Sequence, residues 1–321
     1  MIYIYSPSNS TTGGVELLHQ LSNAIFISGM KVQVIYYPET SGGNAYSHFS
    51  KIYHADIFTE DVQSIDFSDN ILIVGENATH YLRNFQNIKR FIFWMSVDNF
   101  FPKKERSFLL NFYYKLKEIY VGKRLRINEL KSVYHLTQSN YANLFLKKLS
   151  IPYFYLGDYI NDDFFNKSFE KSIKENLILY NPKKGFKHIN KLIRKFPNFK
   201  FVPLVNLNRV ELIKIISKAK LYIDFGLHPG KDRFPREASI LGCCIITNRL
   251  GSANNDFDIS ISDQFKIDTN NLNYEYIESL INVIFNDYES QILNFENYRN
   301  KISSEKEIFF ENVKNTFLKF I

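Results

Sequence analysis

Residues 221–247 read LYIDFGLHPGKDRFPREASILGCCIIT, the pattern of a strand, a basic loop, a helix and a second strand. The apolar runs Leu221–Phe225 and Cys243–Thr247 have the length and composition of buried strands. Between them, Pro235 suits the first turn of a helix, where its missing N–H is not needed, and Glu237 is expected in that same turn. The stretch therefore predicts an α/β arrangement in which a glycine-containing loop meets a helix N-terminus.

The loop between these elements is suited to an anion. Backbone N–H groups at a helix start favour phosphate, and Lys231, Arg233 and Arg236 add positive charge. Gly230 and His228 lie in the same loop. A solvated basic loop can have this composition too, so the loop alone leaves both interpretations open.

The order of loop, helix-start glutamate, short helix, Gly-Cys and apolar strand resembles the nucleotide-sugar site of GT-B glycosyltransferases. Many retaining members of that class have two acidic residues there, separated by seven others. Glu237 matches the second acid, whereas Pro229 occupies the position of the first. The resemblance implies that Glu237 binds the ribose hydroxyls of a nucleotide-sugar donor. It does not extend to the retaining mechanism.

The rest of the chain supplies two successive α/β sets. Residues 2–37 read as a strand, a helix and a strand, which is typical of parallel sheets. The resemblance implies two Rossmann-like domains facing a cleft, with a C-terminal helix crossing back to the first. We place the N-terminal acceptor domain at 1–160 with helix 305–321, and the donor domain at 161–304. Strands are expected at 2–6, 31–37, 70–74, 89–97, 133–138, 152–156, 176–180, 200–205, 221–225 and 243–247, and further helices at 15–27, 140–149, 186–196 and 209–218.

Composition places the chain among globular proteins with anionic partners. Its 321 residues suit two domains, and a net charge of +7 fits nucleotides, acidic glycans, phospholipid surfaces or nucleic acid without choosing among them. The adjacent Cys243 and Cys244 cannot form a disulfide framework, which predicts a reducing cytosol. The sequence shows no secretory signal and no spanning helix, so any membrane contact is expected to be peripheral.

Three further loops are expected to contribute to the cleft. Lys183 and Lys184 follow a strand and could neutralise a diphosphate leaving group without a metal, although a solvated lysine pair is an equal alternative. The loop of Gly251 and Ser252 could bind phosphate or sugar, or be an ordinary turn. In the first domain, Gly13-Gly14 would allow close backbone approach to a ligand.

The catalytic base of an inverting transfer is expected in the first domain. Glu76 and Asp98 follow predicted strands and could take the proton of an acceptor hydroxyl. Asp98 could equally cap a turn, and Glu76 could pair with a nearby basic group. His19 and His228 are further candidates, although a single histidine is more often structural.

Residues 100–131 interleave aromatic and basic side chains. Such a segment can lie on an anionic membrane surface, meet an anionic glycan or RNA, or form a basic helical hairpin over the first sheet.

These observations favour a metal-independent, inverting glycosyltransferase that acts on a glycan or lipid-linked glycan acceptor. It would need no cofactor, its nucleotide sugar being a substrate, and no metal site is predicted. A nucleotide-sugar epimerase or phosphorylase of the same architecture is the enzymatic alternative. A non-catalytic basic protein that binds glycans or nucleic acid is the other, although no recognised RNA or DNA motif is present.

Overall fold

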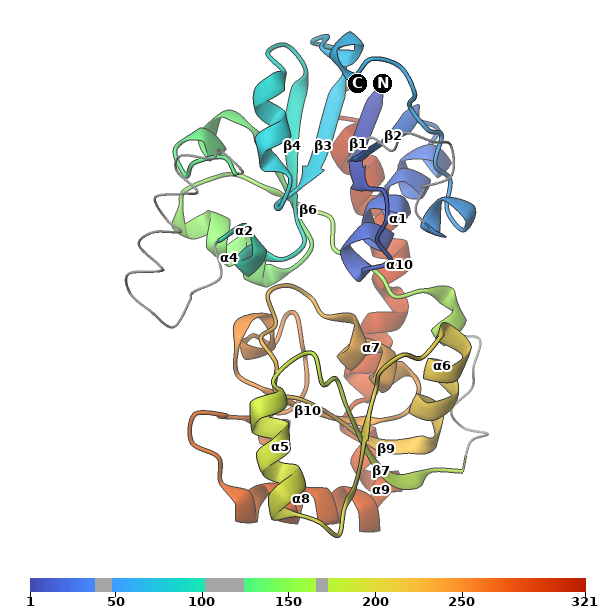
Figure 1. The fold of residues 1–321 in the computed structure, drawn as a ribbon, viewed down its shortest axis with the longest axis vertical. Helices are drawn as coiled ribbons and strands as arrows, with labels where there is room; N and C mark the ends of the chain where they lie inside the picture. The colour runs from blue at the N-terminus through green and yellow to red at the C-terminus, as the bar shows by residue number, and fades with distance from the viewer. Residues whose placement is uncertain (38–47, 102–123, 166–172) are drawn as a thin grey trace. The chain divides into compact units, whose positions relative to one another are not determined.

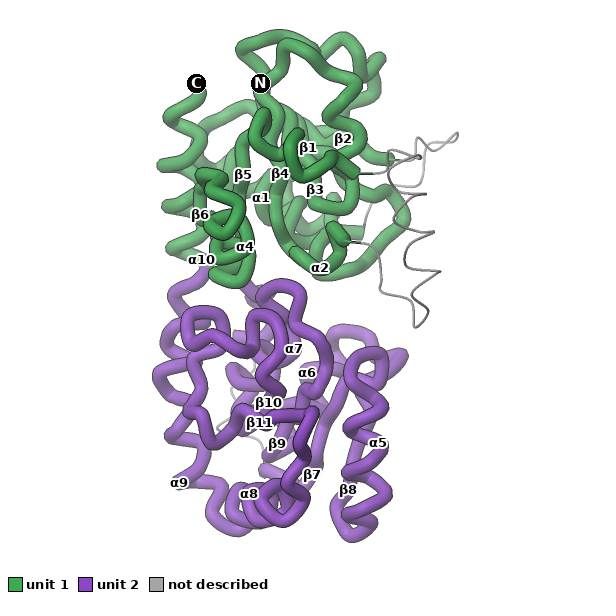
Figure 2. Tube along the Cα trace, turned by 90° about the vertical axis from the view of Figure 1, so that its left-hand side faces the viewer, with its two compact units in different colours: residues 1–158, 306–321 green, residues 159–305 purple. Residues whose placement is uncertain are grey.

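The structure, a computed structural model, describes residues 1–37, 48–101, 124–165 and 173–321 (Figure 1). Most of the basic-aromatic segment, residues 102–123, lies outside the described residues. The chain divides into two compact units (Figure 2). Unit 1 comprises Met1–Asp158 and Lys306–Ile321, and unit 2 comprises Tyr159–Glu305. Among the described helices, none is both long enough and apolar enough to cross a membrane.

Within the described residues, unit 1 contains a sheet of six parallel strands in the order β2-β1-β3-β4-β5-β6. The strand β1 lies between β2 and β3, so the strand order reverses between β1 and β3. The strands are β1 (Ile2–Pro7), β2 (Val32–Tyr37), β3 (Ile71–Gly75), β4 (Lys89–Trp94), β5 (Tyr134–Thr137) and β6 (Phe154–Tyr155). Helices in this part of the chain are α1 (Gly13–Ile27), α2 (Val97–Phe100) and α4 (Asn140–Lys148).

Unit 2 contains a parallel sheet of five strands among its described residues, in the order β11-β10-β9-β7-β8. Here β7 lies between β8 and β9, so the strand order reverses between β7 and β9. The strands are β7 (Glu175–Tyr180), β8 (Lys200–Pro203), β9 (Ala219–Asp224), β10 (Cys244–Asn248) and β11 (Lys266–Ile267). The helices are α5 (Phe186–Lys195), α6 (Arg209–Lys218), α7 (Arg233–Ile240), α8 (Tyr274–Asn286), α9 (Tyr288–Leu293) and α10 (Glu296–Phe317), which continues into unit 1.

Each unit has its own core because both faces of each sheet are covered, and the strands are therefore apolar along their length. Ile71, Leu72, Ile73 and Val74 of β3 are all at most 1% exposed, for example. Both cysteines are buried and free, as expected. Burial raises the pKa of the Cys243 thiol to about 11, so this group stays protonated and inert.

The predicted α/β class is confirmed, but several boundaries differ, three of them near the predicted functional residues or by many residues. The strand β4 ends at Trp94 rather than at residue 97, because a short helix already starts at Val97. The final helix α10 begins at Glu296, nine residues before the predicted start. Helix α7 begins at Arg233 after the N-cap Asp232, so Glu237 is its fifth residue and lies beyond the first turn.

Candidate functional site

The loops predicted to bind an anion lie where the strand order of unit 2 reverses. Lys183 and Lys184 follow β7, and residues 225–232 follow β9, which pairs with β7 directly. Ligands of open parallel sheets bind at such a switch point, beyond the carboxyl ends of the strands. The loop of Gly251 and Ser252 follows β10, the next strand along. The structure therefore brings all three predicted loops to one edge of the sheet.

Glycines let these three loops touch. A Cβ built on Gly185 would overlap the carbonyl group of Phe225, and one on Gly226 would lie 2.5 Å from Lys184 Cβ. At Gly251 a Cβ would lie close enough to the carbonyl oxygen of His228 to overlap it. Gly185 and Gly251 also have φ of +63° and +60°, values that favour glycine. The close packing of the loops thus depends on residues without side chains.

Hydrogen bonds fix the same contacts. The backbone N–H of Ser252 donates to the carbonyl of His228 at 2.8 Å, and Ser252 Oγ donates to that of Gly230 at 2.6 Å. The amide of Asn248, the last residue of β10, donates to the carbonyl of Gly226 at 2.6 Å. Ser252, which the sequence predicted to bind phosphate or sugar, is therefore bonded to the loop that follows β9.

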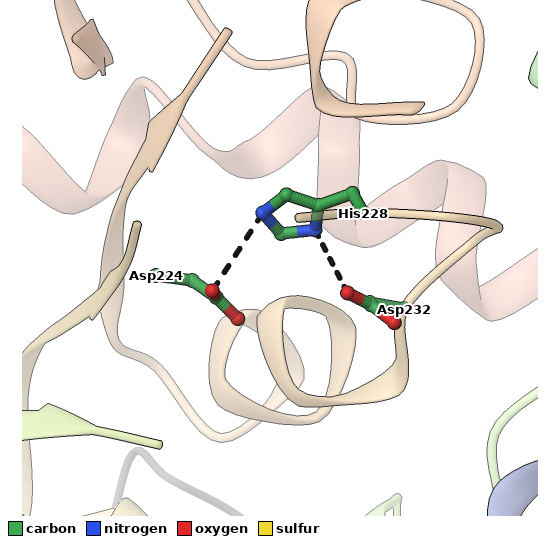
Figure 3. Close-up of side chains that lie close together, drawn as sticks. All are labelled: Asp224, His228 and Asp232. Carbon is green, nitrogen blue, oxygen red and sulfur yellow. Dashed lines mark ion pairs between the residues drawn. The ribbon is translucent and has the colours of Figure 1, made fainter. Parts of the chain in front are cut away.

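A chain of ionisable side chains runs through these loops, and Figure 3 shows three of its members, Asp224, His228 and Asp232. Lys184 Nζ lies 2.7 and 2.8 Å from the two carboxylate oxygens of Asp232. His228 Nδ1 lies 2.9 Å from Asp232 Oδ2, and its Nε2 lies 3.7 Å from Asp224 Oδ1. Asp224 in turn accepts hydrogen bonds from the Tyr222 hydroxyl and the Gly226 backbone, each at 2.9 Å. We call Lys184, Asp232, His228 and Asp224 the charge chain.

The charge chain sets the protonation of its members. Burial lowers the pKa of His228, but the close contact with the Asp232 carboxylate and the charge of Asp224 outweigh it, so the net pKa is raised. Burial raises the pKa of Asp232, but His228 and Lys184 outweigh it, and the net pKa is lowered. His228 is fully buried between two carboxylates, and these shifts favour its charged form.

The same three residues have the spacing of metal ligands. Donor atoms of Asp224, His228 and Asp232 lie within 4.8 Å of one another. The two carboxylates are already engaged, however, because Lys184 contacts both oxygens of Asp232 and Tyr222 donates to Asp224. A metal ion would have to displace the lysine and leave its charge uncompensated. Lys184 would therefore compete with a cation for Asp232.

Lys231 and Arg236 occupy a second buried cluster. Lys231 Nζ lies 2.5 Å from Glu305 Oε1, and Arg236 Nη1 lies 2.7 Å from Glu305 Oε2. The Lys231 side chain is only 4% exposed. Its burial and its partner favour an indirect role for Lys231, in place of the direct donor contact that the sequence suggested.

The remaining predicted donor residues differ in exposure. Lys183 is exposed, Lys184 is about one-third exposed at 35%, and Arg233 is half-buried. Glu237 on α7 is 6% exposed and Gly230 is buried. Among these basic residues Lys183 is therefore exposed, whereas Lys184 and Arg233 are partly exposed.

In unit 1 the predicted residues also gather at a switch point. The Gly13-Gly14 segment follows β1, and Glu76 follows β3, which pairs with β1. The side chain of Met95, just after β4, lies against both Gly14 and Gly75: Cβ atoms built there would be 3.7 Å from its Sδ and 2.9 Å from its Cε. Gly13 and Gly14 are the first residues of α1 rather than part of a loop, so the start of α1, the end of β3 and the residue after β4 meet at Met95.

The two candidate bases have different surroundings. Glu76 is 3% exposed, and its Oε2 accepts a hydrogen bond from the Met95 backbone at 3.0 Å. Burial raises the pKa of Glu76 to about 7, against the lowering effect of that bond. Asp98 on α2 is partly exposed and accepts from the Tyr141 hydroxyl at 3.3 Å, and burial raises its pKa as well. The alternative candidate His19 is fully buried and bonded to Val15 and Tyr36, which fits a structural role.

Some residues of these two clusters were predicted from the sequence and others were not. Asp224 and Asp232 are not among the predicted site residues. Their spacing of four residues on either side of His228 is the signal that could have joined them. Glu305 gave no signal, because it lies 69 residues after Arg236 on a charged helix.

A surface hollow of about 680 Å³ lies on helix α8. Its lining includes Glu275, Glu278 and Asp287 and no basic residue. It is therefore unsuited to a phosphate and is separate from the strand-end loops.

The fold of the whole chain is that of GT-B glycosyltransferases. Sucrose-phosphate synthase from Thermosynechococcus elongatus is similar over 99% of this chain and 97% of its own, with a TM-score of 0.66 at 10% identity. HepE from Anabaena, in complex with UDP-glucose, is similar over 99% of both chains, with a TM-score of 0.63 at 10% identity.

The catalytic domain of starch synthase IV from Arabidopsis thaliana, bound to ADP and acarbose, is similar over 97% of this chain and 99% of its own. Its TM-score is 0.55 at 13% identity. No protein-family model matches the sequence, and no curated protein matches it. The likeness is therefore one of fold, carried by architecture rather than by sequence.

Proposed function

We propose that the protein is a glycosyltransferase that moves a sugar from a nucleotide-sugar donor to a hydroxyl of a glycan or lipid-linked glycan. The observation that carries this proposal is the meeting of three loops, two of them basic, at the switch point of unit 2. Structures of the same fold contain UDP-glucose in HepE and ADP in starch synthase IV. Unit 2 is then the donor domain and unit 1 the acceptor domain.

In the proposed complex the diphosphate lies over the loops that follow β7 and β9. Lys183 and Arg233 supply positive charge, and backbone N–H groups near Gly230 and Gly251 supply donors. Lys184, which is paired with Asp232 but still one-third exposed, turns from that carboxylate to the phosphate. Glu237 binds the ribose hydroxyls, because a carboxylate accepts two hydrogen bonds from a diol. His228 and Lys231 support the loop from beneath, since both are buried and paired.

A test of donor binding uses Glu237→Ala. Loss of the carboxylate is expected to weaken nucleotide binding by roughly tenfold or more, since a charge-assisted hydrogen bond contributes about 1.5–3 kcal/mol. Calorimetric titration with UDP and with ADP measures the effect. Glu278→Ala, an exposed glutamate of the same unit, is the control and should bind like the wild type. Equal affinities for both variants would remove Glu237 from the donor site.

Transfer by this protein is proposed to invert the sugar's configuration. A carboxylate of unit 1, Glu76 or Asp98, takes the proton of the acceptor hydroxyl. The hydroxyl oxygen of the acceptor then attacks the anomeric carbon of the donor, and the nucleoside diphosphate leaves. Two features support inversion: Pro229 stands where retaining relatives have an acid, and the Glu76 pKa of about 7 suits a general base. The lysines of unit 2 stabilise the charge on the leaving diphosphate.

Turnover is proposed to be independent of metal, because the basic side chains can stabilise the diphosphate themselves. Addition of EDTA should therefore leave the rate of sugar transfer unchanged, measured as release of the nucleoside diphosphate. A rate that collapses with EDTA and returns with Mn²⁺ would contradict this, and would direct attention to Asp224, His228 and Asp232.

The acceptor and the location are proposed from the basic-aromatic segment 100–131. Peripheral contact of the basic-aromatic segment 100–131 with the inner face of a membrane would bring the protein to a lipid-linked acceptor. A panel of nucleotides and short nucleic acids, scored by thermal shift, distinguishes the proposal from a nucleic-acid-binding role. Stabilisation by nucleotides alone is the expected result.

A further inference from the structure

We propose that Glu305 is a positioning residue that holds the anion-binding loop of unit 2 in shape through Lys231 and Arg236. This inference deepens the proposed function, since the loop is the one assigned to the diphosphate. Glu305 lies on α10, remote in sequence from the loop, and contacts both basic residues through its two oxygens. It does not itself reach the outer surface of the loop, because its side chain is 6% exposed.

The first step is the burial of the cluster. The Arg236 side chain is fully buried, and the side chains of Lys231 and Glu305 are at most 6% exposed. Taking such groups out of water costs several kcal/mol each, and a pair in this setting often adds no net stability over apolar residues. Such a cluster is therefore weak evidence for stability and better evidence for a requirement on local geometry.

The second step is what Arg236 does with its remaining donors. Its Nη2 donates to the carbonyl of Lys231 at 3.0 Å, and its Nε donates to the carbonyl of Asp232 at 3.2 Å. Ser252 Oγ holds the preceding carbonyl, that of Gly230, at 2.6 Å. Three successive carbonyls of the loop are thus fixed by side chains.

The third step concerns the other side of these peptide groups. In a trans peptide the N–H and C=O point in opposite directions. Fixing the carbonyls of Gly230, Lys231 and Asp232 therefore turns the N–H groups of residues 231–233 away from Arg236 and Ser252. Successive N–H groups that point the same way form an anion-binding concavity. Glu305 maintains this arrangement because it fixes the guanidinium that holds two of the carbonyls.

The test compares Glu305→Gln with Glu307→Gln, an exposed glutamate two residues further along the same helix. Calorimetry with UDP as the probe, and ADP as a second probe, should show affinity reduced by roughly tenfold or more in the first variant and unchanged in the second. Lys231→Met should weaken UDP binding too. The double variant Glu305→Gln/Lys231→Met should lose less than the sum of the single losses, because the two residues act together.

A readout without nucleotide separates this inference from the proposed function. Amide hydrogen exchange of residues 230–237 should be faster in Glu305→Gln than in the wild type, with little change in the strands of unit 1. A wild type that binds neither UDP nor ADP would refute the proposed donor site, and the exchange comparison would then decide the positioning role alone.

Unchanged UDP affinity together with unchanged exchange in Glu305→Gln overturns the inference. A lower Tm with intact UDP affinity overturns it as well, because it would show a role in stability only. If Glu305→Gln does not fold, Glu305→Asp takes its place. Aspartate keeps the negative charge, but its side chain is shorter by one methylene. The same two measurements then apply, with the same expected and contradicting results.

Discussion

Glu76→Gln is expected to lower kcat by roughly 100-fold or more while leaving the affinity for the donor nearly unchanged. Glutamine has the same shape and can still accept the hydrogen bond from the Met95 backbone, but it cannot take a proton from an acceptor hydroxyl. Steady-state rates and nucleotide titration measure the two quantities separately. Asp98→Asn is made in parallel, and the base is the residue whose amide loses most activity. Near-normal rates in both variants would exclude both carboxylates.

The pH dependence gives a second signature of Glu76. A base with a pKa of about 7 makes kcat/KM rise with pH up to about 7 and level off above it. Stability should change in the opposite sense. Because burial raises this pKa from 4.5 to about 7, the folded state keeps a proton that the unfolded state has released. The free energy of unfolding therefore falls as pH rises between 4.5 and 7, and Glu76→Gln should remove that part of the dependence.

The stereochemistry of the product tests the mechanism independently. An inverting transfer gives a product whose anomeric configuration is opposite to that of the donor, which NMR of the product reports directly. Retention would overturn the inverting assignment even if Glu76 proved essential.

Gly251→Ala is expected to have the largest effect on structure. Its Cβ would overlap the carbonyl oxygen of His228, which is backbone and cannot rotate away. The left-handed φ of +60° adds about 1–2 kcal/mol, and the overlap adds about 1–3 kcal/mol more. The loop after β10 must then move away from the loop after β9. We expect a lower Tm by calorimetry and loss of most nucleotide affinity.

Gly29→Ala is the matched control for that experiment. Gly29 also has a left-handed φ, of +81°, but an added Cβ there meets no atom within 4 Å. Gly29→Ala should therefore lose only the stability that the left-handed φ costs an alanine, and should keep wild-type nucleotide affinity. Equal losses of stability in the two variants would show that the contact between Gly251 and His228 does not constrain the loops.

The fold could be predicted from the sequence because the strands are short, continuous apolar runs with glycine-containing loops after them. The strand β3 and the pair β9 and β10 were visible for this reason. Helices α8 and α9 were not assigned, although Ile277, Ile281 and Ile284 are buried at helical spacing. Helix α10 was placed too late, since the charges in its first turns mask the buried Tyr298 and Ile302.

The candidate site could be predicted only where it is local in sequence. The loops after β7, β9 and β10 were visible because each has its own glycines and charges. The ion pairs between their side chains could not be predicted, because Lys184 and Asp232, and likewise Lys231 and Glu305, are distant in sequence and are brought together by the fold. The sequence shows that a lysine is present but not whether its charge is already compensated.

The division of the chain has a consequence for biosynthesis. Unit 1 is interrupted in sequence, since residues 159–305 separate its first 158 residues from Lys306–Ile321. The later segment carries Phe309, Val313 and Phe317, all fully buried, and Asn312 donates a hydrogen bond to the carbonyl of Leu156. A ribosome completes unit 2 before it makes this segment. The nascent unit 1 must therefore wait with part of its apolar surface uncovered, while unit 2 already has all its residues and can fold first.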